Sequence, residues 1–273
     1  MKMSRLLRMI IAALVSMLAF VAACSPPPED ETAPTPTLSS RWPATEFYEV
    51  PDSIRDATIV WSAEPGIDLF SAEAKLFRAA QESVFIGWMI GLDYTYVGFK
   101  DSSGSKGGGG IFGDFEDDTG EGPFVGTIHG RIQQIIPTDT GFDVLGCVLS
   151  VGLDVRTNDK YSPSRLTDGE GGDLRSRFIR TVDPKSVLET PPTSSVRKPS
   201  SLHWQAPTGD QFTGWEVEGF VDIDPATAEK GRCVPWAKSL YPDAPAVIPR
   251  DAYANDEPPP VLPAFPGWPE DRY

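Results

Sequence analysis

The chain of 273 residues carries 24 Lys and Arg against 39 Asp and Glu, for a formal net charge of −15, and 40% of its residues are hydrophobic. Such an acidic protein repels phosphate backbones and anionic headgroups, which argues against nucleic acid as a partner and against membrane adhesion through a basic surface. The hydrophobic fraction suffices for a buried core, while 27 prolines and 25 glycines indicate long loops or tails.

The amino-terminal 24 residues contain the most specific motif. Lys2, Arg5 and Arg8 precede an apolar run that begins at Met9 and ends in Val21-Ala22-Ala23-Cys24. This arrangement resembles the signal peptide of bacterial lipoproteins. The resemblance implies that residues 1–23 are removed, that Cys24 receives a lipid such as palmitate, and that the protein sits on the extracytoplasmic face of the cell membrane. The alternative is an ordinary secretory signal in which Cys24 is incidental. A membrane-spanning helix is disfavoured, because it would need about 20 apolar residues and this run is shorter.

Residues 24–45 are expected to tether the domain to its lipid. Five prolines and no core-forming run occur in residues 25–40, which predicts a semi-rigid extended segment of up to about 50 Å. The folded domain is then expected over residues 46–240.

The strongest helical pattern covers residues 69–97. Apolar side chains recur there at intervals of three and four residues, and Ser71 is a candidate amino-terminal cap with Glu73 in the first turn. The apolar stripe consists of Phe77, Ala80, Val84, Trp88, Leu92 and Tyr96. The sequence therefore predicts one long amino-terminal helix.

A Gly-rich, acidic insertion follows at residues 101–122. Its acidic end, Asp114 to Glu121, could gather oxygen ligands for calcium, but the spacing of an EF-hand fails and a solvated loop is the favoured interpretation. Gly108, Gly110 and Gly113 match a dinucleotide fingerprint without the strand and helix that such a site requires. We therefore predict neither a metal nor a cofactor.

The pattern then changes to strands. Residues 124–136 and 142–155 are rich in Val, Ile, Leu and Phe and are joined by a hairpin-like connection at residues 137–141. Residues 173–182 suggest a short or edge strand, and the alternation in residues 211–223 predicts a half-buried strand. The expected sheet is a curved antiparallel meander of three to five strands.

Cys147 and Cys233 are the two cysteines that remain if Cys24 carries lipid. In an exported protein a single remaining pair predicts a disulfide, with two free buried thiols as the alternative. Residues 241–273 contain nine prolines and are expected to form a tail that is either extended over the domain or disordered.

The order of helix, irregular region and meander, together with the late Cys233-Val234-Pro235-Trp236 segment, is similar to the NTF2-like (cystatin-like α+β) domains of exported actinobacterial lipoproteins of the mycobacterial type. That resemblance implies a cone in which the helix packs across the concave face of the sheet. The mouth of the cone would bind a small apolar molecule or an envelope protein. Trp88, Asp93, Tyr96 and His129 are the candidate pocket residues.

The predicted function is therefore non-catalytic binding in the cell envelope. One alternative is an enzyme that uses His129 with Asp93 or Asp143 as its acid and base pair. Another is an exclusion or immunity lipoprotein of prophage type, which would block an envelope partner.

Overall fold

The computed structural model describes residues 48–103, 122–181, 201–219, 221, 231–248 and 254–268. The predicted signal peptide at 1–23, Cys24, the tether to residue 45 and nearly all of the acidic insertion lie outside the described residues. All described residues belong to one unit, Pro43–Tyr273.

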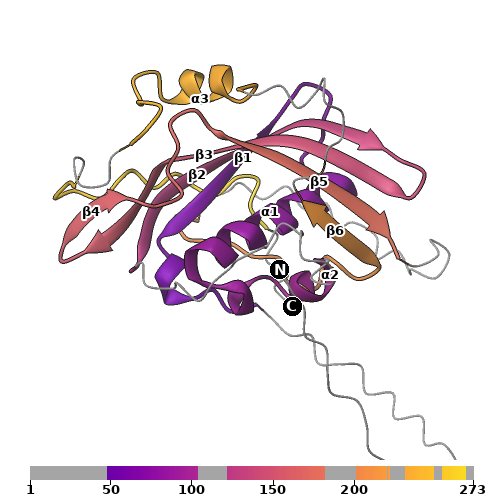
Figure 1. Cartoon of the computed structure of the whole chain (residues 1–273). Helices are drawn as coiled ribbons and strands as arrows, with labels where there is room; N and C mark the ends of the chain where they lie inside the picture. The colour runs from indigo at the N-terminus through magenta and orange to yellow at the C-terminus, as the bar shows by residue number, and fades with distance from the viewer. Residues whose placement is uncertain are drawn as a thin grey trace, which may run out of the picture. The chain divides into compact units, whose positions relative to one another are not determined.

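One open, curved sheet organises this unit (Figure 1). Its strand order is β1-β2-β3-β5-β6, with β4 paired to β3; β1 is parallel to β2, and the other neighbours are antiparallel. The strands are β1 (Ala57–Ala63), β2 (Phe124–Pro137), β3 (Gly141–Thr157), β4 (Lys160–Pro163), β5 (Gly172–Arg180) and β6 (Trp215–Gly219). The helices are η1 (Asp52–Ile54), α1 (Ala72–Ile90), η2 (Leu92–Tyr94), α2 (Phe99–Ser102) and α3 (Val234–Leu240).

The α+β class agrees with this architecture, but the expected order of elements is wrong at its start. The strand β1 precedes the helix and makes a parallel pair with β2, so the sheet is not a pure antiparallel meander. The segment 173–182, predicted as a short strand or an edge element, forms the strand β5, which lies inside the sheet between β3 and β6.

The helix α1 is also shorter than the predicted span 69–97. The Ser71 side chain caps it by accepting the Ala74 N–H, as predicted. The helix ends at Gly91, which adopts φ +111° and donates its N–H to the Gly87 carbonyl. Glycine reaches a positive φ without strain, so it terminates the helix nearly two turns earlier than the apolar stripe suggested.

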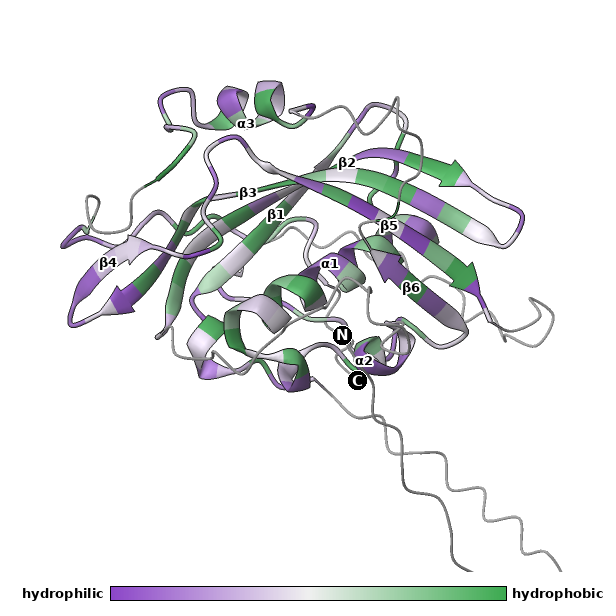
Figure 2. Ribbon diagram, viewed as in Figure 1, coloured by the Kyte–Doolittle hydropathy of each residue, from purple (hydrophilic) through white to green (hydrophobic). Residues whose placement is uncertain are grey.

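The core lies between α1 and one face of the sheet. Phe77 of α1 contacts the rings of Trp61 and Phe178 edge-on, and Phe178 stacks on Phe142. Hydrophobic and polar residues follow one another along β2, β3 and β5 (Figure 2), as expected for strands whose successive side chains point to opposite faces of the sheet. Nearly every residue of α1 is buried, because chain segments also cover the side of the helix that faces away from the sheet.

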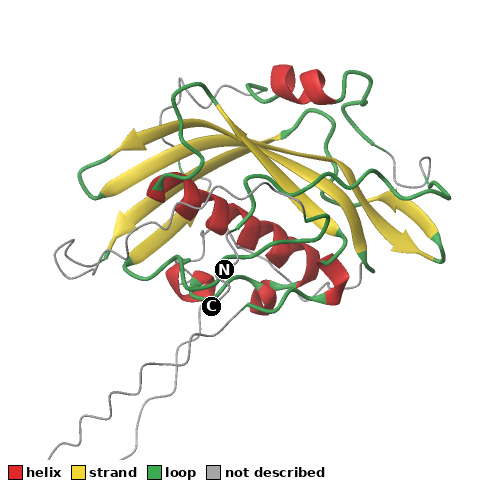
Figure 3. Ribbon diagram, turned by 180° about the vertical axis from the view of Figure 1, so that it is seen from behind, coloured by secondary structure: helices red, strands yellow, loops and turns green. Residues whose placement is uncertain are grey.

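The other face of the sheet carries α3, as the reverse view shows (Figure 3). The predicted disulfide between Cys147 of β3 and Cys233, just before α3, is confirmed, with Cα atoms 5.6 Å apart. It fixes the start of α3 to the centre of the sheet. No helix within the described residues is long and apolar enough to span a bilayer.

The segment 254–268, part of the predicted tail, lies against the domain: Asn255 pairs with Tyr161 of β4, and the later part follows the outer edge of β1. Phe265 bridges Val60, donating its N–H to Ile59 and accepting the N–H of Trp61. Leu262 exchanges further hydrogen bonds with Thr58 and Thr127. The outer edge of β1 is therefore covered by backbone from the end of the described chain.

Candidate functional site

A cavity of about 300 Å³ lies between α1 and the sheet. Its apolar wall consists of Val84, Phe85, Trp88, Ile128, Val148, Leu166 and Leu174, and its other lining residues are Gln81, Ser150, Asp168, Gly172, Asp173, Arg175, Ser176 and Gly219. This volume is at the lower end of the range for small-molecule sites, about 300–1,000 Å³.

Two sequence periods place these residues around one space. On α1 the lining residues Gln81, Val84, Phe85 and Trp88 are spaced as one helical face. On the sheet the lining pairs are two residues apart, as Val148 with Ser150 and Leu174 with Ser176, so each pair shares one strand face. The cavity therefore lies between one face of α1 and one face of the sheet. Elsewhere along these two faces, other side chains fill the space between them.

The segment between β4 and β5 forms one side of the cavity and is fixed to β3. Ser150 donates its hydroxyl to the carbonyl of Leu166, and Thr167 lies within hydrogen-bond distance of the Ser150 carbonyl. Ser164 donates its N–H to Leu153. Asp168 accepts the N–H of Glu170 and so is used within its own turn.

Two of the three charged residues of the lining, Asp173 and Arg175, are paired with each other, and Asp173 is also paired with the region before α3. Asp173 forms ion pairs with Arg175, at 3.0 Å, and with Arg232. Arg232 also donates to the carbonyls of Gly146 and Leu174. Arg232, next to Cys233, therefore contacts β5 beside the cavity, on the face of the sheet opposite to α1.

The four predicted pocket residues occupy different places. Trp88 lines the cavity. His129 follows the cavity residue Ile128 on β2 and so projects from the opposite face, where its Nε2 lies 3.4 Å from the Tyr241 hydroxyl and burial lowers its pKa. Asp93 is exposed and pairs with Lys100, and Tyr96 is buried on another side of α1.

Neither carboxylate that was considered as a partner for His129 is paired with it. Asp143 accepts two hydrogen bonds from Arg177, at 2.8 and 3.0 Å, while Asp93 is held by Lys100. His129 has the Tyr241 hydroxyl as its side-chain partner among the described residues. The arrangement that general acid and base catalysis would require is thus not assembled at these residues.

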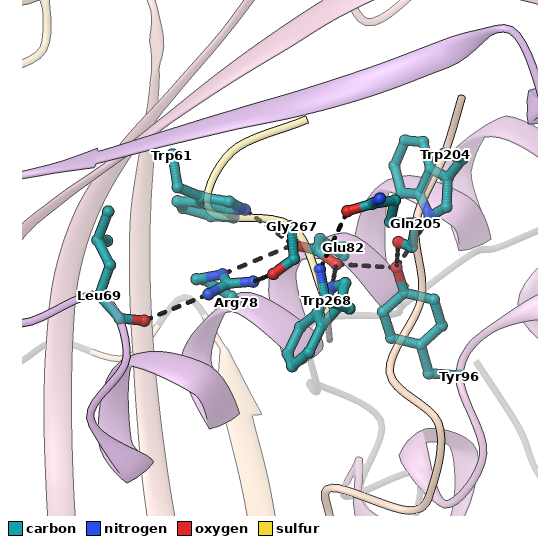
Figure 4. Close-up of polar contacts among 9 residues, drawn as sticks. All are labelled: Trp61, Leu69, Arg78, Glu82, Tyr96, Trp204, Gln205, Gly267 and Trp268. Atoms are coloured by element: carbon teal, nitrogen blue, oxygen red, sulfur yellow. Dashed lines mark hydrogen bonds and ion pairs between the residues drawn. The ribbon is translucent and has the colours of Figure 1, made fainter. Parts of the chain in front are cut away.

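Apart from the cavity, a cluster of polar side chains centred on Glu82 is buried on the side of α1 near β1 (Figure 4). Its carboxylate accepts hydrogen bonds from Trp61 Nε1 at 2.8 Å, from Tyr96 Oη at 2.8 Å and from Trp268 Nε1 at 2.6 Å. Arg78, one turn earlier, lies 4.0 Å from the carboxylate. We call these five residues the Glu82 cluster.

Further contacts join the Glu82 cluster to the chain around it. Arg78 donates to the carbonyls of Leu69 and Gly267 and stacks over the Trp268 ring at 4.4 Å. The Tyr96 hydroxyl accepts a hydrogen bond from Trp204 Nε1. The cluster therefore links β1, α1, the segment after η2, the 201–212 segment and the residues around 267.

Burial dominates the electrostatics of the Glu82 cluster. Glu82 and Arg78 are each 1% exposed. Desolvation raises the pKa of the Glu82 carboxyl, and the nearby Arg78 and the three donors oppose that rise. Desolvation likewise lowers the pKa of Arg78 and raises that of Tyr96. Since none of these residues lines the cavity, we interpret the cluster as structural.

Sequence reasoning missed most of both sites. Arg78 and Glu82 are an i,i+4 charged pair inside a strongly apolar helical pattern, and that pair was the available signal for a buried ionic cluster. Gln81 and Ser176 of the cavity are ordinary polar residues in sequence and gave no signal.

The part of the chain that the structure describes contains no group of three or more His, Cys, Asp or Glu residues placed to bind a metal ion. The acidic residues 114–121, considered for calcium, are outside that part. Comparison of the chain with protein-family models, with curated proteins and with solved structures found no match.

Proposed function

We propose that this chain is a lipid-anchored protein of the cell envelope whose domain, an NTF2-like cone, binds a small and mainly apolar molecule without transforming it. The cavity between α1 and the sheet is the observation that carries the proposal. Its wall is largely aliphatic and aromatic, with a few polar side chains among them, which is the usual composition of a small-molecule site.

The placement of the ionisable residues favours binding over catalysis. An enzyme that uses this cavity would need an acid or base directed into it, whereas His129 projects from the other face and Asp93 is exposed. The carboxylates that do line the cavity are engaged, Asp173 by two arginines and Asp168 by its own turn.

A neutral apolar fluorophore, N-phenyl-1-naphthylamine, tests binding. We expect saturable fluorescence enhancement with the domain, and Val148→Phe should weaken it at least tenfold because the larger side chain projects into the cavity. Val247→Phe is the matched control, since Val247 is 79% exposed and outside the cavity. No saturable enhancement with the parent protein, or equal binding by both variants, would refute the proposal.

The anchor is tested separately by metabolic labelling with a fatty acid. Cys24→Ser should lose the label and leave an unprocessed or released protein. Equal labelling of the parent and of Cys24→Ser would reject lipidation at this residue and leave the cavity proposal standing.

A further inference from the structure

One pair of polar side chains, Gln81 of α1 and Ser176 of β5, interrupts the apolar wall of the cavity. Gln81 Nε2 donates to Ser176 Oγ at 2.8 Å, and the two residues are 3% and 1% exposed. The pair therefore bridges the helix and the sheet at a point that is shielded from bulk water.

The hydrogen bond between Gln81 and Ser176 uses only part of their capacity. A primary amide has two N–H donors and a carbonyl acceptor, and a hydroxyl both donates and accepts. Within the described residues, this is the only side-chain hydrogen bond that either residue makes. The amide oxygen of Gln81 and the hydroxyl proton of Ser176 are thus available to a group in the cavity, and buried polar groups are normally satisfied.

The surroundings of this pair favour an uncharged partner. Neither side chain is ionisable, and a charge buried beside them would lack a counter-ion and incur a large desolvation cost. The ionisable side chains of the lining, Asp168, Asp173 and Arg175, sum to a negative charge, and Arg175 is already paired with Asp173. A carboxylate ligand is disfavoured by that balance and by the acidic chain as a whole.

We infer that the cavity selects a small lipid-like alcohol, with its hydroxyl bonded to both the Gln81 amide oxygen and the Ser176 hydroxyl and its apolar body against Val84, Phe85 and Trp88. An alcohol can donate to the amide oxygen and accept from the serine hydroxyl at once, which an ether or a carboxylate cannot do. This inference rests on the proposed binding function and names the class of ligand for the same cavity.

Displacement of N-phenyl-1-naphthylamine by four eight-carbon probes tests the selection. Octan-1-ol should displace the fluorophore at the lowest concentration, about 3- to 10-fold below its isomer heptyl methyl ether, which has no O–H to donate. Octanoate should be weaker still, because the ionisable side chains of the lining already sum to a negative charge. Octylamine should also be weaker, because its ammonium would be buried beside an uncharged pair while Asp173 is paired with two arginines and Asp168 accepts a hydrogen bond within its own turn. An ether or carboxylate that equals octan-1-ol would overturn the inference.

Two variants assign the preference to the polar pair. Ser176→Ala, and independently the nearly isosteric Gln81→Met, should abolish the advantage of the alcohol over the ether while retaining binding of the fluorophore. Ser102→Ala is the control, since Ser102 is buried but donates to Phe99 away from the cavity. An unchanged preference in whichever of the first two variants is folded contradicts the inference.

The two proposals fail in different ways. Saturable fluorophore binding without alcohol preference rejects the ligand class and keeps the binding function. Absence of saturable fluorophore binding to the parent protein rejects the binding function and, with it, the ligand class.

Discussion

Replacement of Glu82 by Gln should strongly destabilise the domain while hardly changing the volume of the side chain. The Glu82 side chain is 1% exposed, and its carboxylate accepts three hydrogen bonds, from two Trp indoles and the Tyr96 hydroxyl. An amide presents an N–H to at least one of these donors, which leaves two donors facing each other. It also leaves the buried guanidinium of Arg78 without its counter-ion.

The magnitude follows from the loss of the buried charge. Removing one partner of a buried ion pair costs about 3–5 kcal/mol, and an unsatisfied buried donor costs about 1–3 kcal/mol, so we expect a combined loss of about 4 kcal/mol. For a domain of this size each kcal/mol corresponds to about 2–4 °C, which predicts a decrease in Tm of about 8–16 °C.

Thermal and urea unfolding of Glu82→Gln beside Glu73→Gln provide the measurement. Glu73 lies half-buried in the first turn of the same helix, and its replacement should cost less than about 1 kcal/mol. If the charge is the cause, Arg78→Met should cost at least about 1 kcal/mol less in the Glu82→Gln background than in the parent. A Glu82→Gln protein within about 1 kcal/mol of the parent would refute the reasoning and indicate a protonated Glu82.

Three further outcomes follow from the fold. Gly130→Ala should destabilise the domain, since a Cβ there would lie 2.3 Å from the Trp61 ring, and a Tm equal to that of the parent would contradict this packing. Removal of the disulfide by Cys147→Ala with Cys233→Ala should cost up to about 4–5 kcal/mol by the chain-entropy model for a separation of 86 residues, measured by urea unfolding. Burial raises the pKa of Asp154, which is 6% exposed, from 3.8 to about 6. The free energy of unfolding is therefore highest below about pH 4 and falls by up to about 3 kcal/mol as the pH rises through 6. Asp154→Asn should therefore be more stable than the parent at pH 7 and lose this advantage at pH 4, and a difference that is independent of pH would exclude this carboxyl.

The elements that the sequence predicted well are those with local signals. The hairpin of β2 and β3, the cap at Ser71 and the disulfide each depend on residues close in sequence or on a simple pairing argument. The helix stripe likewise identified Trp88, which lines the cavity.

The features that were missed depend on partners far along the chain. The strand β1 is short, and its pairing with β2 joins Ala57 to Gly126 across the acidic insertion. Trp268 stands in a Pro-rich segment with a tail-like composition, and its burial depends on Arg78 and Glu82 of a distant helix. The available hydrogen-bonding capacity of Gln81 becomes visible only when Ser176 is placed opposite it.

The cover over the outer edge of β1 has a consequence for folding. The backbone groups of Ile59 and Trp61 bond to Phe265, about two hundred residues later, so this contact is among the slowest for the chain to find. Until it forms, β1 presents an open strand edge on which a second copy of the chain can pair. Aggregation during refolding should therefore originate at β1, and a peptide of the 258–268 sequence supplied in excess should suppress it by occupying that edge.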